Sequence, residues 1–141
     1  QSRNTGENIT FSYNELKKLK NDSGMPSSMI IVQKPFMERR AYATFMKQWP
    51  QEGNKNRPEI IVTSPPIQWE KYWMEHDGNV KRAQIDLIMG GDLSRIKWYG
   101  NPEGSTYYQI SQKIPTDVWI AGQNLVQRGY IGNLINGRNT L

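Results

Sequence analysis

The pattern of hydrophobic and polar positions predicts two strands separated by a helix in the first half of the chain. Residues 29–32 (M-I-I-V) form a continuous apolar run, which is typical of a strand buried on both faces in a parallel sheet. Residues 59–63 (E-I-I-V-T) repeat this pattern. Between them the apolar positions recur with a helical period, at Ala41, Tyr42, Phe45, Met46 and Trp49. We therefore expect a βαβ unit with parallel strands and a right-handed crossover.

A further helix is expected before the first strand. Asn4 is a favourable N-cap, and Glu7 three residues later completes the Asn version of a capping box. The breakers of residues 22–26 predict that this helix ends near Asn21. Its apolar face would consist of Ile9, Tyr13, Leu16 and Leu19.

The second half of the chain has a less regular pattern. We expect an irregular or short helical lid over residues 67–73 and a helix capped by Asn79, with a break at Gly90 and Gly91. Residues 107–110 suggest a short extended piece, and a last helix should run from Pro115 to near Gly129. Residues 131–141 look like a loose tail. Since no linker is visible, we interpret residues 1–141 as one domain.

Composition excludes several kinds of site but does not indicate a function. The formal net charge of +5 favours anionic partners, whether a nucleotide or a nucleic acid, but it also fits ordinary solubility. The absence of cysteine excludes a disulfide framework and any thiolate nucleophile or ligand, and His76 alone cannot build a histidine-rich metal site. These residue counts lead us to expect no metal. No apolar run reaches the length of a membrane span, and we expect a cytoplasmic protein. The chain opens directly on a helix entrance, and we expect upstream polypeptide to complete the domain.

Three polar segments should meet at the carboxyl edge of the predicted sheet, where open α/β sheets bind ligands: the helix entrance at residues 4–8, a charged loop at residues 34–40, and residues 63–64. The first helix entrance offers backbone N–H groups to an anion, and arginine can grip a phosphate or carboxylate with paired hydrogen bonds. Glu7 or Glu38 could orient a ribose or amine, or act as a base. The candidate ligand-binding residues are Asn4, Thr5, Asn8, Lys34, Arg39, Arg40, Thr63 and Ser64.

Each of these features also has a purely structural interpretation. Asn4 and Glu7 could serve only as helix caps, and Arg39 and Arg40 could form a solvated first turn with Glu38. The aromatic side chains of residues 69–73 fit packing better than a base-stacking platform. Only the shared location of the three segments supports the binding hypothesis.

Three stretches of the sequence resemble the YdcF/SanA/ElyC family, and its YdcF branch in particular. They are N-T-G-E-N at residues 4–8, K-P-F-M-E-R-R-A-Y-A-T-F at 34–45 and I-V-T-S-P at 61–65. The resemblance extends over most of residues 1–130. It implies an α/β, Rossmann-like three-layer fold with a mostly parallel sheet, of which this chain would be the carboxyl-terminal part, without the first strands.

The resemblance also implies a nucleotide-type ligand, for which S-adenosylmethionine is a suggested candidate in the YdcF branch. Arg40 aligns with a family arginine, whereas Met37 stands where many members have histidine, so an acid–base role is not carried over at that position. We therefore expect binding of a small anionic or nucleotide-type ligand. Any reaction would be a transfer or hydrolysis at a nucleotide-type substrate. The alternative is a non-catalytic or envelope-associated scaffold whose basic surface binds nucleic acid or anionic surfaces; nucleic acid ranks second because no interleaved basic-aromatic motif is present.

Overall fold

The computed structural model describes residues 1–19, 25–51, 57–68, 84–104, 107–132, 134–135 and 141. These fall into two compact units, which are described separately. The N-terminal unit comprises residues 1–65 together with 108–110, and the C-terminal unit comprises residues 66–107 and 111–141. The fold class is α/β, as predicted from the alternation of helical and strand periods.

Helix α1 (Thr5–Lys18) begins as its sequence predicts. The side chain of Asn4 accepts a hydrogen bond from the Glu7 backbone N–H at 2.9 Å. The Glu7 carboxylate accepts one from the Arg3 N–H at 2.6 Å, one residue before the usual capping-box position. The helix ends at Lys18 with Leu19 as its C-cap, which is earlier than the predicted end near Asn21.

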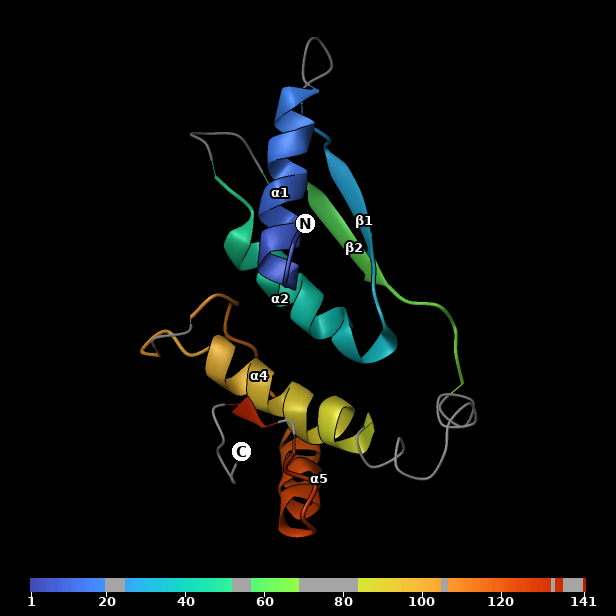
Figure 1. Ribbon diagram of the computed structural model, residues 1–141, viewed down its shortest axis with the longest axis vertical. Coiled ribbons are helices and arrows are strands. Elements are labelled where there is room, and N and C mark those ends of the chain that lie inside the picture. Colours follow the sequence, from blue (N-terminus) through green and yellow to red (C-terminus); the bar gives the residue numbers. More distant parts are fainter. Residues whose placement is uncertain (20–24, 52–56, 69–83, 105–106, 133, 136–140) are drawn as a thin grey trace. The chain divides into compact units, whose positions relative to one another are not determined.

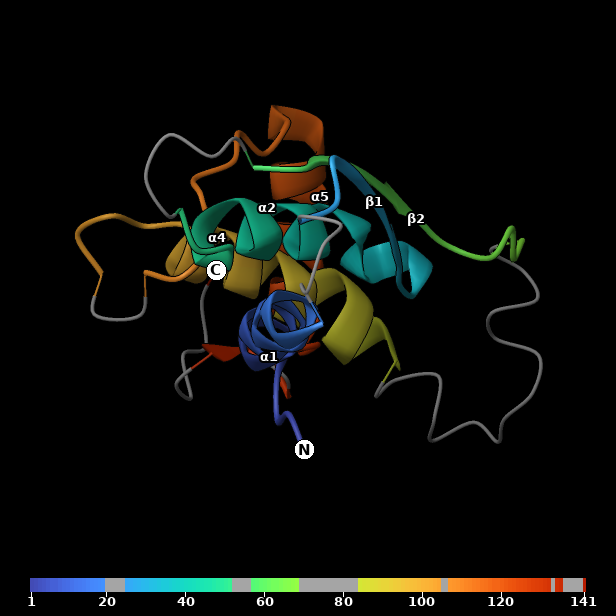
Figure 2. The same cartoon turned by 90° about the horizontal axis from the view of Figure 1, so that it is seen from above.

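Strands β1 (Ser28–Val32) and β2 (Glu59–Thr63) pair in parallel, from Ser28 opposite Glu59 to Val32 opposite Thr63. The expected βαβ unit is therefore present. Helices α1 and α2 lie on the same side of this sheet (Figure 1, Figure 2). They cover the side chains of Met29, Ile31 and Ile60, which pack against the buried core.

The prediction that both strands are buried on both faces is wrong. Exposure alternates along each strand, and the three apolar side chains on the face away from the helices are 68%, 64% and 62% exposed, at Ile30, Val32 and Ile61. An apolar run indicates that a strand is suited to a covered sheet. It does not show whether the structure supplies a second covering layer.

Helix α2 (Glu38–Gln48) follows a short 3₁₀ helix, η1 (Pro35–Met37), so residues 38–40 form its first turn rather than a loop. Its buried stripe differs from the predicted one, because Tyr42 is 41% exposed whereas Ala43 and Thr44 are buried. The Ile110 N–H donates to the Ala43 carbonyl oxygen. A segment more than sixty residues later thus covers a side of α2 that the local pattern marked as solvent-facing.

The core of the N-terminal unit is an aromatic cluster between α1 and α2. The rings of Phe45 and Trp49 stack with centroids 4.8 Å apart, and Tyr13 meets Trp49 edge-on at 5.2 Å. Ile9 completes the buried set. Such aromatic pairs add specific geometry to the burial of their large apolar surfaces.

The C-terminal unit contains a π-helical turn, η3 (Asp86–Gly91), that leads directly into α4 (Asp92–Tyr99). The predicted break at Gly90 and Gly91 is therefore wrong. Both glycines are buried, and the helix accommodates them by widening locally. The predicted lid over residues 67–73 and the cap at Asn79 fall largely or wholly outside the described residues.

Helix α5 (Thr116–Gln127) has Pro115 as its N-cap rather than as its first residue. It stops where predicted, since Gly129 adopts a positive φ of 86°. No strand forms over the described residues 107–110. The prediction of a loose tail over residues 131–141 does not describe Leu134, Ile135 and Leu141, which are buried.

Candidate functional site

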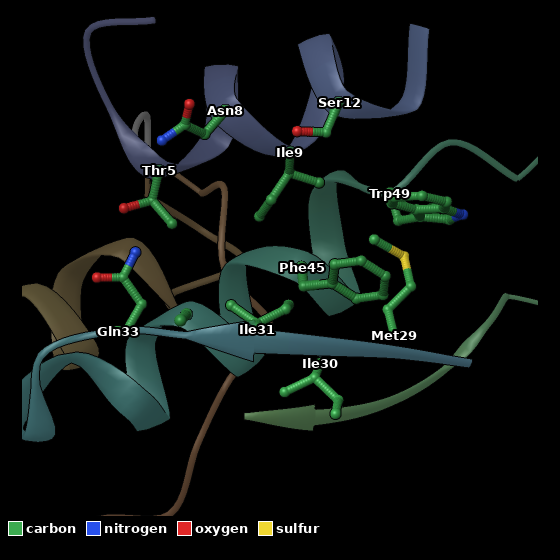
Figure 3. Close-up of a pocket in the computed structure, with 11 residues that line it drawn as sticks. Thr5, Asn8, Ile9, Ser12, Met29, Ile30, Ile31, Gln33, Phe45 and Trp49 are labelled. Atoms are coloured by element: carbon green, nitrogen blue, oxygen red, sulfur yellow. The ribbon is translucent and has the colours of Figure 1, made fainter. Parts of the chain in front are cut away.

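A pocket lies between α1 and β1 in the N-terminal unit, with a volume of about 360 Å³ (Figure 3). We call it the α1–β1 pocket. One wall is the face of α1 that carries Thr5, Asn8, Ile9 and Ser12. The opposite wall is β1 together with Gln33, the residue that follows it. Its lining residues are Thr5, Asn8, Ile9, Ser12, Met29, Ile30, Ile31, Gln33, Ala41, Phe45 and Trp49.

One end of the α1–β1 pocket is apolar. Ile9 and Ile31 face each other across it, and Phe45 and Trp49 close it with the aromatic stack of the core (Figure 3). These side chains are fixed by packing that the core requires in any case. The apolar end is therefore a preformed surface, as small-molecule sites usually are.

The other end is polar and uncharged. Thr5, Asn8 and Gln33 gather there, the first two from the first turn of α1 and the third from the residue after β1 (Figure 3). The Asn8 side-chain oxygen accepts a hydrogen bond from the Ser2 hydroxyl at 2.5 Å. With this oxygen engaged, Asn8 has its amide N–H groups to offer to a ligand.

The pocket is lined in part by β1, whose outer edge pairs with no strand among the described residues. The Glu59 N–H donates to the Ser27 oxygen and the Gln33 N–H donates to the Thr63 oxygen, each at 2.9 Å. In a parallel ladder with this register, the even-numbered residues of β1 direct their backbone groups to the opposite edge. Ile30 and Ile31 point to opposite faces of the strand, yet both line the pocket (Figure 3). The pocket lining therefore includes residues from both faces of β1.

Two of the predicted site residues, Thr5 and Asn8, line the α1–β1 pocket. Asn4 and Glu7 instead line a separate hollow on a neighbouring side of α1, together with Gln48 and other residues. Both are engaged in the N-terminal cap of the helix. These hydrogen bonds confirm that the pair caps the helix.

The remaining predicted residues do not line the α1–β1 pocket. Lys34 and Arg39 are exposed, and Glu38 and Arg40 are half-buried in the first turn of α2. Thr63 pairs with Val32 and shares its exposure, so its side chain lies on the sheet face away from α1. Ser64, half-buried, follows the end of β2. This pocket contains residues of one predicted segment, the helix entrance at residues 4–8, and none of residues 34–40 or 63–64.

Gln33 and Ser12 were not among the predicted site residues, although both line the pocket. Ser12 follows Thr5 by seven residues and so shares its side of the helix. Gln33 is the first residue after β1, at the carboxyl edge that the topology identifies. Both signals were present in the sequence. The prediction instead favoured the charged residues 34–40, which begin one residue after Gln33.

Within the described ranges, no three or more of the residues His, Cys, Asp and Glu lie together as they would around a metal ion. None of the helices in those ranges combines the length and the hydropathy that crossing a bilayer requires.

The chain is similar in sequence to a protein of Streptomyces coelicolor. The chain is 34% identical over 135 residues to the uncharacterized protein SCO4629 of Streptomyces coelicolor, and the match covers 95% of this chain but 53% of that protein. The chain thus spans about half the length of the relative that it matches. No protein-family model matches the chain. No solved structure matches it either.

Proposed function

We propose that the chain binds a small nucleotide-type ligand in the α1–β1 pocket. The observation that carries this proposal is the position of the pocket, which joins the carboxyl end of β1 at Gln33 to the first turn of α1 at Thr5 and Asn8. Ligands of open α/β sheets bind at the carboxyl ends of strands. A volume of about 360 Å³, a mostly apolar lining and a few converging polar groups fit a small-molecule site.

The anionic part of such a ligand would lie outside the uncharged pocket, near its polar end. Lys34 is next to Gln33, is exposed, and can reach a phosphate or carboxylate as a flexible point charge. Arg40 is the second cation of the proposal, because the resemblance to the YdcF branch aligns it with a family arginine. S-adenosylmethionine is one candidate ligand on the same ground. The proposal assigns no reaction, although Glu38 remains available as an acid–base group.

The proposal includes a Rossmann-like arrangement as the finer description of the fold. Parallel sheets are nearly always covered on both faces, yet Ile30, Val32 and Ile61 are bare here. A second helical layer over this face and a further strand along the outer edge of β1 would complete a three-layer fold. We propose that upstream polypeptide of the same domain supplies them, in line with the YdcF-like resemblance.

Blocking the pocket tests the proposed ligand binding. Isothermal titration of the purified chain with S-adenosylmethionine, AMP and ATP should show saturable binding to at least one. Ser12→Phe places a ring at the exposed rim of the pocket and should abolish that binding. Asn14→Phe is the matched control, since Asn14 is exposed on the same helix and lines none of the hollows described here.

Two results would overturn the proposal. One is equal binding by the Ser12→Phe and Asn14→Phe variants, which would place the ligand elsewhere. The other is the absence of saturation by any of the three compounds. If nucleic acid then bound with a steep loss of affinity in salt, the basic-surface scaffold would replace the proposal.

A further inference from the structure

We infer that the α1–β1 pocket receives the neutral heterocyclic ring of its ligand and not its charged group. This inference rests on the proposed function and specifies which part of a nucleotide enters. The ring would lie between Ile9 and Ile31, with its polar edge toward Thr5, Asn8 and Gln33 (Figure 3).

Because its lining is uncharged, the pocket favours the neutral ring of the ligand over the charged group. None of the eleven side chains that line the pocket is Asp, Glu, Lys, Arg or His. An anion that enters a mostly apolar pocket loses its hydration, and here no cation in the wall would compensate for that loss. A flat, uncharged ring loses little hydration and gains apolar burial against Ile9 and Ile31.

The polar end has the hydrogen-bonding groups that recognise the edge of a nucleobase. Asn8, whose side-chain oxygen accepts a hydrogen bond from Ser2, also has N–H donors for a ring nitrogen or carbonyl oxygen. The Gln33 amide offers a donor and an acceptor together, and carboxamides pair in this way with the adjacent donor and acceptor of a purine. Thr5 adds a hydroxyl group. A base with neighbouring donor and acceptor atoms satisfies this set.

The same arrangement places the sugar and phosphate toward solvent. With the ring edge at Gln33, the rest of a nucleotide leaves the pocket close to the chain position of Lys34, which is exposed. The base and the phosphate would thus be recognised by different kinds of interaction. Packing and amide hydrogen bonds hold the base, and a solvent-screened charge interaction holds the phosphate.

Comparison of nucleosides with nucleotides tests the inference. The purified 141-residue chain is titrated with adenosine, guanosine, uridine and cytidine, with their 5′-monophosphates, and with inorganic phosphate. We expect at least one nucleoside to bind within about threefold of its monophosphate, since an exposed charge contact contributes little. Inorganic phosphate at millimolar concentration should not compete with the bound nucleoside.

A matched pair of variants tests whether the side-chain N–H groups of Asn8 bind the ring. Asn8→Asp preserves the shape of the side chain but replaces its amide donors by a carboxylate, so affinity for the nucleoside should fall at least about tenfold. Acidic residues are favourable in the first turn of a helix, so this variant should fold. Asn14→Asp makes the same change in charge at an exposed position of α1 and should bind as the unmodified chain does.

The outcomes separate this inference from the proposed function. If nucleotides bind but nucleosides do not, or if phosphate displaces them, the pocket receives the charged group and the inference is overturned while the proposed function stands. Unchanged affinity in Asn8→Asp overturns it as well. If neither nucleosides nor nucleotides saturate the chain, the proposed function itself fails.

Discussion

Ile30 and Ile61 lie directly opposite each other across the two parallel strands, and both are more than three-fifths exposed. Their neighbours Ile31 and Ile60 point to the other face and pack against the aromatic core. The sheet of the N-terminal unit thus has one packed face and one bare face. This asymmetry leads to the first prediction.

Replacing Ile30 by Thr should change the free energy of unfolding of this chain by less than about 0.5 kcal/mol, because the side chain is already in water. The same replacement at Ile31 should cost about 2 kcal/mol, since it puts a hydroxyl group into the packed face. Urea denaturation of both variants measures the difference. Equal costs would contradict the bare face and indicate that another layer covers it in solution.

Phe45→Ala should destabilise the chain by about 3–5 kcal/mol, because it removes a ring that is 1% exposed and stacked on Trp49. Tyr42→Ala on the same helix is the control and should cost less than about 1 kcal/mol, given that Tyr42 is 41% exposed. Denaturation midpoints followed by tryptophan fluorescence provide the comparison. Similar losses for the two variants would show that the aromatic cluster is not the centre of the core.

Asn4→Ala should cost about 1 kcal/mol, because the Glu7 backbone N–H loses its capping oxygen. Asn4→Asp retains an oxygen at the cap and should leave stability nearly unchanged. Asn14→Ala, within the same helix and exposed, should be neutral or slightly stabilising, since alanine is the better helix former. Thermal unfolding by circular dichroism distinguishes the three. A loss with Asn4→Asp as large as with Asn4→Ala would argue against the cap.

Gly129→Ala should destabilise the C-terminal unit by about 1 kcal/mol. Gly129 has a φ of 86°, and a residue with a Cβ is strained in this left-handed conformation. Gly129→Asn should cost less, since asparagine tolerates this conformation better than other side chains. Gln127→Ala, at the exposed end of α5, tests the neighbouring position and should be close to neutral. Proteolysis rates or urea denaturation provide the readout, and a neutral Gly129→Ala would exclude a positive φ in solution.

Features that depend on a few neighbouring residues could be predicted from the sequence. The cap at Asn4, both strands, their parallel pairing through one helix and the stop at Gly129 all follow from local hydrogen bonding, from chain geometry or from the period of apolar residues. The α1–β1 pocket reaches the carboxyl end of β1, the edge at which this topology predicts ligand binding. Those parts of the prediction needed no knowledge of distant contacts.

The tertiary structure decided which surfaces are covered and which side chains share a pocket. Ala43 is buried because a segment near Ile110 packs on α2, whereas Ile30 is bare because no described element covers it. Gln33 and Asn8 line one pocket through the packing of α1 on β1, while Thr63 lies on the other face by the alternation of strand side chains. Burial and proximity depend on long-range packing. An apolar pattern indicates that a residue favours burial, but it does not show which distant segment will cover that residue.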